Sequence, residues 1–396
     1  MLPYRHRTIG TQMTRGAGYL PRRVRWRARI MIAAGTAIVG VTLTAAAPQA
    51  HADGGTGLLG GFAAEANNGD LTTLVPGSPV IGPDDTGLGM AIGTSPSIAS
   101  VPTSQNYRIA FEANTSNLWV AGPGITSGNT GLGMPPCVRT SGLACTSPSI
   151  AVRTNGNYVV AFMANTGDLW FTGPGIGSVD TRLGVAGDTS PSIAALPNGE
   201  YVAAFQSGSN DDLWFTGPGI GTVDTGQVML SATSPSITVL SNGEYVAAFQ
   251  NRFGDLMVAG PGLASSPVDT GQFMANRTSP SITGVPNNQN GYQIAFQGHN
   301  GSLWTTGALG TGDLGQGMRA GTSPSIINIE FSTSLPNPPG GVPGEYLAFD
   351  IAYQGSNGDL VHETDSLPGS SIVPSIIDTG LAMNAQSSPS NAPFSF

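Results

Sequence analysis

The chain has 396 residues, of which only 10% are charged, and it is rich in glycine (57 residues) and proline (30 residues). Eight of its 15 arginines precede Ile30 and there is no lysine, so residues 53–396 carry seven arginines against 24 acidic residues, a net charge of −17. Such an acidic surface repels phosphate groups, which argues against nucleic acid and anionic lipid as partners of this part.

Residues 1–52 have the features of a secretion signal. Arginines come first, an apolar run follows in IMIAAGTAIVGVTLTAAAP (30–48), and the small residues of AHA end at Ala52. This order is typical of a cleaved signal peptide. We therefore predict a signal peptide over 1–52 and a secreted, extracellular remainder with no transmembrane segment. Arg22 and Arg23 leave the twin-arginine export route open beside the general one, and an uncleaved anchor is the alternative to cleavage.

Three landmarks then recur along the chain, each seven times. The first is TSPSI, the second an apolar strand usually ending in Ala-Phe and followed by a turn and Leu-Trp, and the third DTGLGM with its variants. Copies of TSPSI start at Thr94, Thr146, Thr189, Thr233, Thr278 and Thr322, with a degraded SSPSN at Ser387. Most copies are about 44 residues apart, and a near-constant period of this length is the signature of a repeat fold.

Each unit reads as a short series of strands. In one unit, SPSITVL (234–240) and EYVAAFQ (244–250) are apolar and β-branched with partial alternation, and the SNG between them suits a hairpin turn. A Leu-Trp strand and the DTGLGM segment follow. Residues 53–396 show no sustained helical periodicity. We predict one all-β domain over 53–396, a seven-bladed β-propeller with three to four antiparallel strands per blade.

The two ends of this domain complement each other. GGFAAEANNGDLTTL (60–74) is a second and third strand without a preceding TSPSI, whereas SPSNAPFSF (388–396) is that missing first strand alone. Pairing the two segments completes the seventh blade and removes two exposed sheet edges. We therefore expect the ring to close through its N- and C-terminal segments.

The order TSPSIA, short turn, apolar strand ending in Phe, NTGDLW and glycine-rich outer strand resembles the tectonin-like seven-bladed β-propeller lectins, and also the propeller-repeat proteins exported by actinobacteria. The resemblance covers essentially all of residues 53–396. It implies a propeller that binds carbohydrate at repeated sites on or between its blades. The outer strands here carry Leu and Met where the lectin family often has further aromatic residues.

Two repeat positions are candidates for ligand binding. One holds Trp119, Trp170, Trp214 and Trp304, with Thr72, Met257 and Val361 in the other units. An exposed indole stacks on the C–H face of a sugar, whereas a buried one fills the gap between blades, and both roles stay open. The other position, at the end of the second strand, either bonds sugar hydroxyls or caps the strand; its polar members are Glu112, Gln206, Gln250, Gln297 and Gln354.

The few cysteines and histidines of residues 53–396 give little indication of a catalytic or metal site. Cys137 and Cys145 are the only cysteines, and in an exported protein we predict that they form a disulfide bond. His299 lies in a turn. His362 stands beside Glu363 and Asp365, a group that suits either a metal or acid–base site or an exposed outer strand.

These features predict a non-catalytic binding protein with no cofactor and no metal, and carbohydrate is the favoured partner. A scaffold for protein or cell-surface partners is the alternative. A glycan-active enzyme is third, because glycoside cleavage needs two carboxyl groups at a fixed separation and the adjacent Asp84–Asp85 and Asp211–Asp212 pairs seldom meet that geometry.

Overall fold

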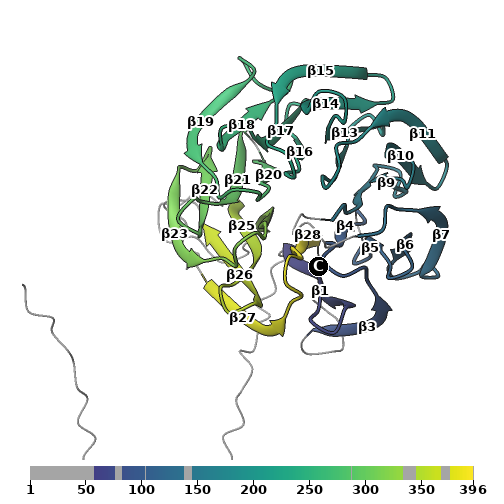
Figure 1. The fold of residues 1–396 in the computed structure, drawn as a ribbon. Helices are drawn as coiled ribbons and strands as arrows, with labels where there is room; N and C mark the ends of the chain where they lie inside the picture. The colour runs from purple at the N-terminus through teal and green to yellow at the C-terminus, as the bar shows by residue number, and fades with distance from the viewer. Residues whose placement is uncertain are drawn as a thin grey trace, which may run out of the picture. The chain divides into compact units, whose positions relative to one another are not determined.

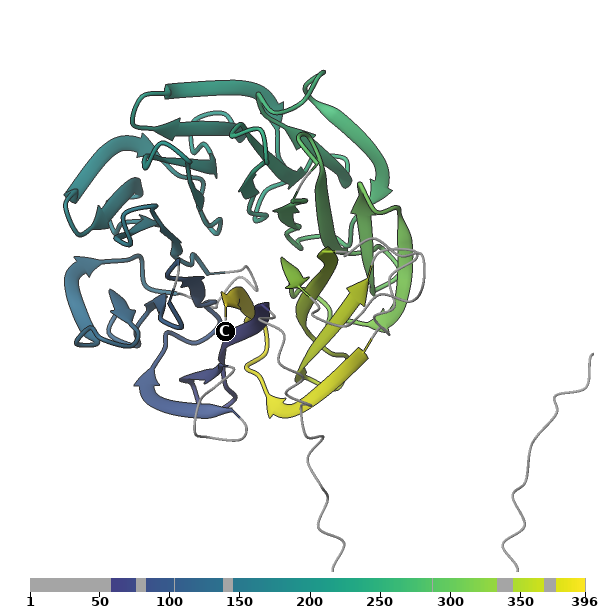
Figure 2. The same cartoon turned by 180° about the vertical axis from the view of Figure 1, so that it is seen from behind.

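The computed structural model describes residues 58–75, 83–102, 104–137, 145–286, 288–332, 345–366 and 375–395. They form seven four-stranded antiparallel sheets, arranged as blades around a common axis (Figures 1 and 2). The predicted seven-bladed β-propeller is confirmed, with four strands in every blade. Within the described residues no helix is long and apolar enough to cross a membrane. The predicted signal peptide, residues 1–52, lies outside them.

The blades are numbered in chain order, and their strands run from the inner to the outer edge. Blade 1 contains β28 (Ser390–Ser395), β1 (Leu58–Glu65), β2 (Asp70–Leu74) and β3 (Asp84–Gly89). Blade 2 contains β4 (Ser97–Ser100), β5 (Tyr107–Glu112), β6 (Asn117–Ala121) and β7 (Gly128–Gly133). Blade 3 contains β8 (Ser149–Val152), β9 (Tyr158–Met163), β10 (Asp168–Gly173) and β11 (Gly177–Gly184).

Blade 4 contains β12 (Ser192–Ala195), β13 (Tyr201–Gln206), β14 (Asp212–Gly217) and β15 (Gly221–Val228). Blade 5 contains β16 (Ser236–Val239), β17 (Tyr245–Gln250), β18 (Asp255–Ala259) and β19 (Val268–Phe273). Blade 6 contains β20 (Ser281–Gly284), β21 (Tyr292–Gln297), β22 (Ser302–Gly307) and β23 (Gly312–Gly317). Blade 7 contains β24 (Ser325–Ser332), β25 (Glu345–Gln354), β26 (Asp359–Ser366) and β27 (Ser375–Ala382).

The apolar core lies between neighbouring blades. Every residue of β13 and of β17 is buried, because each second strand has a strand on both sides and another blade on both faces. Val202 and Phe215 of blade 4 pack in one cluster with Phe249 of blade 5. The outer strand β15 is mostly exposed. Blade stacking therefore explains why the second strands read as continuous apolar runs.

The serines of TSPSI join the blades in two closed rings of hydrogen bonds. In the first ring the backbone N–H of each leading serine donates to the hydroxyl of the leading serine in the next blade, at 2.8–2.9 Å. Its members are Ser95, Ser147, Ser190, Ser234, Ser279, Ser323 and Ser388.

The second ring runs in the opposite direction. The hydroxyl of each second serine accepts a backbone N–H from the next blade, at 3.1–3.2 Å. Its members are Ser97, Ser149, Ser192, Ser236, Ser281, Ser325 and Ser390. The threonine of the motif has a local role, since the Thr189 hydroxyl donates to the carbonyl of Ala186 at 2.8 Å and closes the turn before the strand.

The ring closes as the sequence predicts. β28 pairs antiparallel with β1, with Phe394 opposite Leu59 and Ser390 opposite Ala63, so the last segment supplies the inner strand of blade 1. Figure 1 shows β28 beside β1 near the axis. The predicted disulfide between Cys137 and Cys145 is also present, with the two Cα atoms 5.2 Å apart.

We expect removal of residues 390–396 to destabilise the whole domain. The deletion leaves β1 without its inner partner and removes the buried ring of Phe394, whose loss alone costs about 3 to 5 kcal/mol. Thermal unfolding followed by circular dichroism measures the effect, and Phe394→Ala should reproduce part of it. A truncated protein that melts at the wild-type temperature would contradict closure by β28.

We expect Ser192→Ala to cost about 1 to 3 kcal/mol of unfolding free energy, because it leaves the backbone N–H of Ile237 without its 3.1 Å acceptor. Ser178→Ala, at an exposed position of β11, is the control and should change stability by less than about 0.5 kcal/mol. Urea unfolding of both variants measures the difference. Equal midpoints would show that the serine rings contribute little.

Candidate functional site

One face of the propeller carries the linkers between blades together with the turns between the second and third strands. The chain leaves each outer strand by a linker to the next blade, and the turn between the second and third strands lies at the same end of the sheet. Linker and turn meet through single β-bridges such as Met229 with Asn251 and Met274 with Gly298. We call this the linker face. Both sites described below lie on it.

The four predicted glutamines are buried at this face. Their Nε2 atoms donate to backbone carbonyls of the following turn and, in three of them, of the linker, at 2.9–3.4 Å. These residues are Gln206, Gln250, Gln297 and Gln354. The contacts support the strand-capping role. Each Oε1 is buried without a hydrogen-bond partner among the described residues, so sugar contact by these residues stays a prediction.

Glu112 occupies the same position in blade 2 and is fully buried. Neither of its carboxyl oxygens has a hydrogen-bond partner among the described residues. Burial raises the pKa of Glu112 to about 8, because a carboxylate without partners is poorly solvated there. At neutral pH the side chain is therefore mostly a protonated acid, which is uncharged like the glutamine amides of blades 4 to 7.

The four predicted tryptophans are half-buried and pack at the seams between blades. Trp119, Trp214 and Trp304 lie 6.1–6.3 Å, centroid to centroid, from a phenylalanine of the neighbouring strand. Trp170 packs on the cluster between blades 2 and 3. Trp304 donates its indole N–H to the Asn300 side chain at 3.1 Å, whereas the indole N–H groups of the other three have no partner among the described residues. Packing and ligand contact are thus both compatible with this position.

Trp214 lines an open pocket of about 510 Å³ at the seam between blades 3 and 4. Arg182 and Leu183 come from the outer strand of blade 3, and Ser207 and Ser209 from the turn after β13. The Ser207 and Ser209 hydroxyls lie 2.7 Å apart. We call this the Trp214 pocket. It combines a large aromatic ring with hydroxyl groups and a cation.

A second pocket, of about 360 Å³, lies over the end of blade 5 and was not predicted. It is lined by Arg252 and Phe253 from the turn after β17 and by Phe273 at the end of β19. His299, from the turn after β21 in blade 6, also lines it. Of the predicted residues, Gln250 also lines it. We call it the blade-5 pocket. The two phenylalanines break the repeat pattern, and this signal was available in the sequence.

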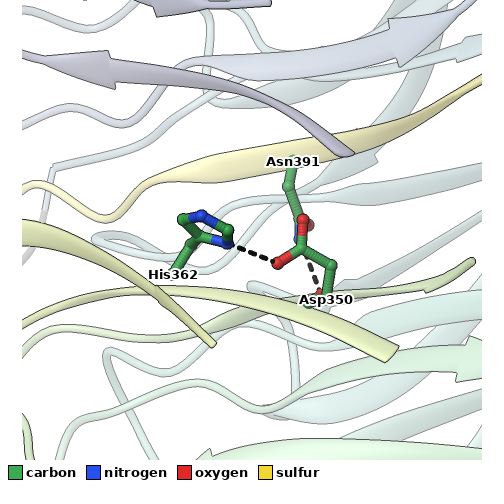
Figure 3. A network of polar contacts seen from close by, with 3 residues as sticks. All are labelled: Asp350, His362 and Asn391. Carbon is green, nitrogen blue, oxygen red and sulfur yellow. Dashed lines mark hydrogen bonds and ion pairs between the residues drawn. The ribbon is translucent and has the colours of Figure 1, made fainter. Parts of the chain in front are cut away.

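His362 makes a contact other than the one its sequence neighbours suggested. Its Nδ1 lies 3.1 Å from the Asp350 Oδ1, and its ring lies 5.1 Å from the ring of Phe62 in blade 1. Figure 3 shows Asn391 of β28 beside this pair, its Nδ2 donating to the Asp350 carbonyl at 2.8 Å. Within the described residues no group of three histidine, cysteine or acidic side chains is placed to hold a metal. The His362–Asp350 pair lies within blade 7, and the contacts of its members with Phe62 and Asn391 cross the seam to blade 1.

Aspartates on the third and fourth strands of a blade are bridged by an asparagine, which is a structural role. Asn210 donates from its Nδ2 to both Asp212 and Asp224, at 2.7 and 3.0 Å. Burial and the nearby Asp224 raise the pKa of Asp212. The same amide bridge recurs in blades 1 and 7 through Asn68 and Asn357. These pairs pin the third strand to the fourth.

Solved structures resemble this fold at low sequence identity. A crystal structure of AofleA from Arthrobotrys oligospora matches with a TM-score of 0.51 and 12% identity, over 76% of this chain and 90% of that one. A form of the same protein with three arginines replaced by alanine matches with a TM-score of 0.52 and 12% identity, over the same shares. At this identity the likeness concerns the fold alone.

A variant of the Aleuria aurantia lectin in complex with Fucα1-6GlcNAc matches with a TM-score of 0.47 and 11% identity, over 74% of this chain and 98% of that one. The fungal lectin of that name is a six-bladed propeller, whereas this chain has seven blades. No protein-family profile and no curated protein match the chain.

We expect Glu112→Gln to stabilise the protein at neutral pH and to change its pH dependence. The folded-state pKa of about 8 lies above the ordinary value of 4.5, so the folded protein keeps a proton that the unfolded chain releases. The unfolding free energy of the wild type should therefore fall as pH rises from about 5 to 8, by up to about 1.4 kcal/mol per pH unit, and then level off. Urea unfolding at pH 5, 7 and 9 tests this. Parallel profiles for variant and wild type would contradict it.

Proposed function

We propose that the protein is a non-catalytic binding protein and that it binds carbohydrate through pockets on the linker face. The Trp214 pocket carries this proposal. A half-buried indole offers an apolar face for the C–H side of a sugar ring, and Arg182, Ser207 and Ser209 supply hydrogen-bonding groups around it. A volume of about 510 Å³ suits a mono- or disaccharide.

The backbone at Arg182 supports a role for this pocket. Arg182 has a φ of 57°, in the left-handed region, and the same position holds glycine in the other six blades. An L-residue other than glycine pays about 1 kcal/mol or more in that conformation. Arg182 is thus placed at a cost in stability that its siblings avoid. Such a cost is common where a side chain serves binding.

Export and family membership belong to the same proposal. The composition of residues 1–52 supports a cleaved signal peptide and a secreted domain, and the order of landmarks within each unit supports a relation to the tectonin-like lectins or to the exported actinobacterial repeat proteins. Repeated weak sites on one ring would suit a ligand that is displayed densely, because avidity then exceeds the affinity of each site.

A scaffold that binds a protein or a cell surface is the second candidate. Its support is the outer strand β27, where Ile376 and Ile377 are both exposed on an unpaired sheet edge. Apolar side chains along a free edge are a feature of strand-addition interfaces.

The proposal is tested with the pair Arg182→Gly and Trp214→Met. Each variant takes the residue of a sibling blade, as at Gly226 and Met257, so both should fold and melt within a few degrees of the wild type. Binding of monovalent methyl glycosides is measured by isothermal titration calorimetry. Because related folds were crystallised with fucosides, α-methyl-L-fucoside is the first probe, followed by neutral hexosides.

We expect each variant to lose one bound sugar per chain or to bind it about ten-fold more weakly, since a charged hydrogen-bond donor or a flat aromatic face is lost. Trp214→Ala provides the contrast: if Trp214 only packs, this change costs about 3 to 5 kcal/mol of stability and leaves binding intact. Full stoichiometry and affinity in folded Arg182→Gly and Trp214→Met, or no binding of any glycoside by the wild type, would overturn the proposal.

A further inference from the structure

The blade-5 pocket is built from residues that depart from the repeat. Phe253 stands where three other blades have asparagine, at Asn68, Asn300 and Asn357. Phe273 stands where the other outer strands have glycine, alanine or valine, as at Gly184, Ala382 and Val228. A packing role is shared by all copies of a repeat, so residues found in a single blade need another explanation.

Packing does not supply that explanation. Phe253 is 70% exposed and Phe273 is 60% exposed, the two highest values among the large apolar side chains described. Phe253 also forgoes the amide bridge to the outer-strand aspartate that its asparagine siblings make. Two phenyl rings that gain little from burial line one pocket, together with Leu230. They give the pocket apolar walls open to solvent.

The same pocket holds a cation that no acid neutralises. The Arg252 guanidinium carbon lies 4.7 Å from the centre of the Phe253 ring, and no carboxylate lies within 4.0 Å of its nitrogens among the described residues. His299 also lines the pocket. In residues 53–396 acidic residues outnumber arginines by more than three to one, yet Arg252 has no acidic partner among the described residues. Its guanidinium is therefore available to bind an anion beside the exposed aromatic rings.

The Gln250 side chain at this pocket has a hydrogen-bond acceptor without a partner among the described residues. Gln250 is fully buried, lines the pocket, and donates its amide hydrogens to the carbonyls of Gly254 and Ala275. This leaves its Oε1 without a partner among the described residues.

We infer that the blade-5 pocket binds a hexuronic acid residue of an acidic glycan, with the sugar ring against Phe253 and Phe273 and its carboxylate on the Arg252 guanidinium. This inference rests on the proposed function, and it gives one blade a ligand different from that of the Trp214 pocket. A volume of about 360 Å³ accommodates one pyranose ring rather than a protein segment. Guanidinium matches a carboxylate in a planar, two-bonded geometry.

The test compares three ligands on the wild-type protein: methyl β-D-glucuronide, methyl β-D-glucoside and methyl β-D-glucoside 6-sulfate. The first two differ only by carboxylate against hydroxymethyl, so their affinity ratio reports recognition of the carboxylate. We expect the glucuronide to bind about ten-fold or more tightly than the glucoside, and we expect this preference to weaken as salt is raised. Preference for the sulfate over the glucuronide would assign the pocket to sulfated sugars and overturn the inference.

The variants are Arg252→Asn, Phe253→Asn and Phe273→Ala, each the residue of a sibling blade and therefore compatible with the fold. Arg252→Asn should abolish the glucuronide preference, and the two phenylalanine variants should weaken all three ligands. Arg319→Ala is the matched control, because it removes an arginine that lines neither pocket, takes the residue of a sibling unit, as at Ala275, and should leave the preference unchanged.

The results that would contradict the inference can be told apart from a failure of the proposed function. Equal affinity for glucuronide and glucoside, or a preference that survives Arg252→Asn, would overturn the acidic-sugar site while leaving neutral sugar binding at the Trp214 pocket untouched. Loss of the glucuronide preference in Arg182→Gly but not in Arg252→Asn would place recognition in the Trp214 pocket and would equally overturn the inference.

Discussion

The two serine rings are the interactions on which the rest of the structure depends. Each inner strand meets its neighbours at the axis, where the strands of adjacent blades are not joined in one sheet. The backbone N–H groups of Ser190 and Ile193 would be left without acceptors there, and the hydroxyls of Ser234 and Ser149 supply them. Because every blade repeats this exchange, the bonds form closed circuits. The circuits close between blades 1 and 2, where Ser388 donates its N–H to Ser95 and the Ser390 hydroxyl accepts the N–H of Ile98.

A scaffold held at repeated positions frees the other positions to differ. Two positions on the linker face show this freedom, although the linkers also supply the leading serines of the first ring and buried apolar residues such as Met229 and Met274 to the seams. Arg182 keeps a left-handed backbone that glycine adopts more easily, and Phe253 exposes a ring where an asparagine would bond. Both residues lie in pockets. In a repeat protein, departures of this kind are a better guide to function than the shared positions are.

The fold was predictable because its causes are periodic. The 44-residue spacing, the missing first strand at one end and the surplus one at the other define the blades, their number and the pairing of β28 with β1. The candidate site was harder to predict. The sequence shows that a glutamine ends the second strand, but not that the Gln250 amide turns toward the linker carbonyl of Ala275.

The contact of His362 with Asp350 could not be predicted from the sequence for a related reason. Neighbouring residues of a strand point to opposite faces, so His362 does not share a face with Glu363. Its partner, Asp350, lies on the adjacent strand. The blade-5 pocket could have been found by comparing the seven copies position by position. The tryptophans recur along the chain and so stand out in the sequence, whereas Phe253 and Phe273 each occur in one unit only.

The linker face has a consequence for how ligands would be presented. In each blade the turns after the second strand and the linkers after the fourth lie at the same end of the sheet, so the Trp214 and blade-5 pockets open on one side of the ring. If both pockets bind glycans as proposed, a molecule with these sites on one side would lie flat against a glycan-coated surface and engage several chains of the same coat. Such a molecule would be poorly shaped to bridge two separate particles, because agglutination needs sites that face away from each other.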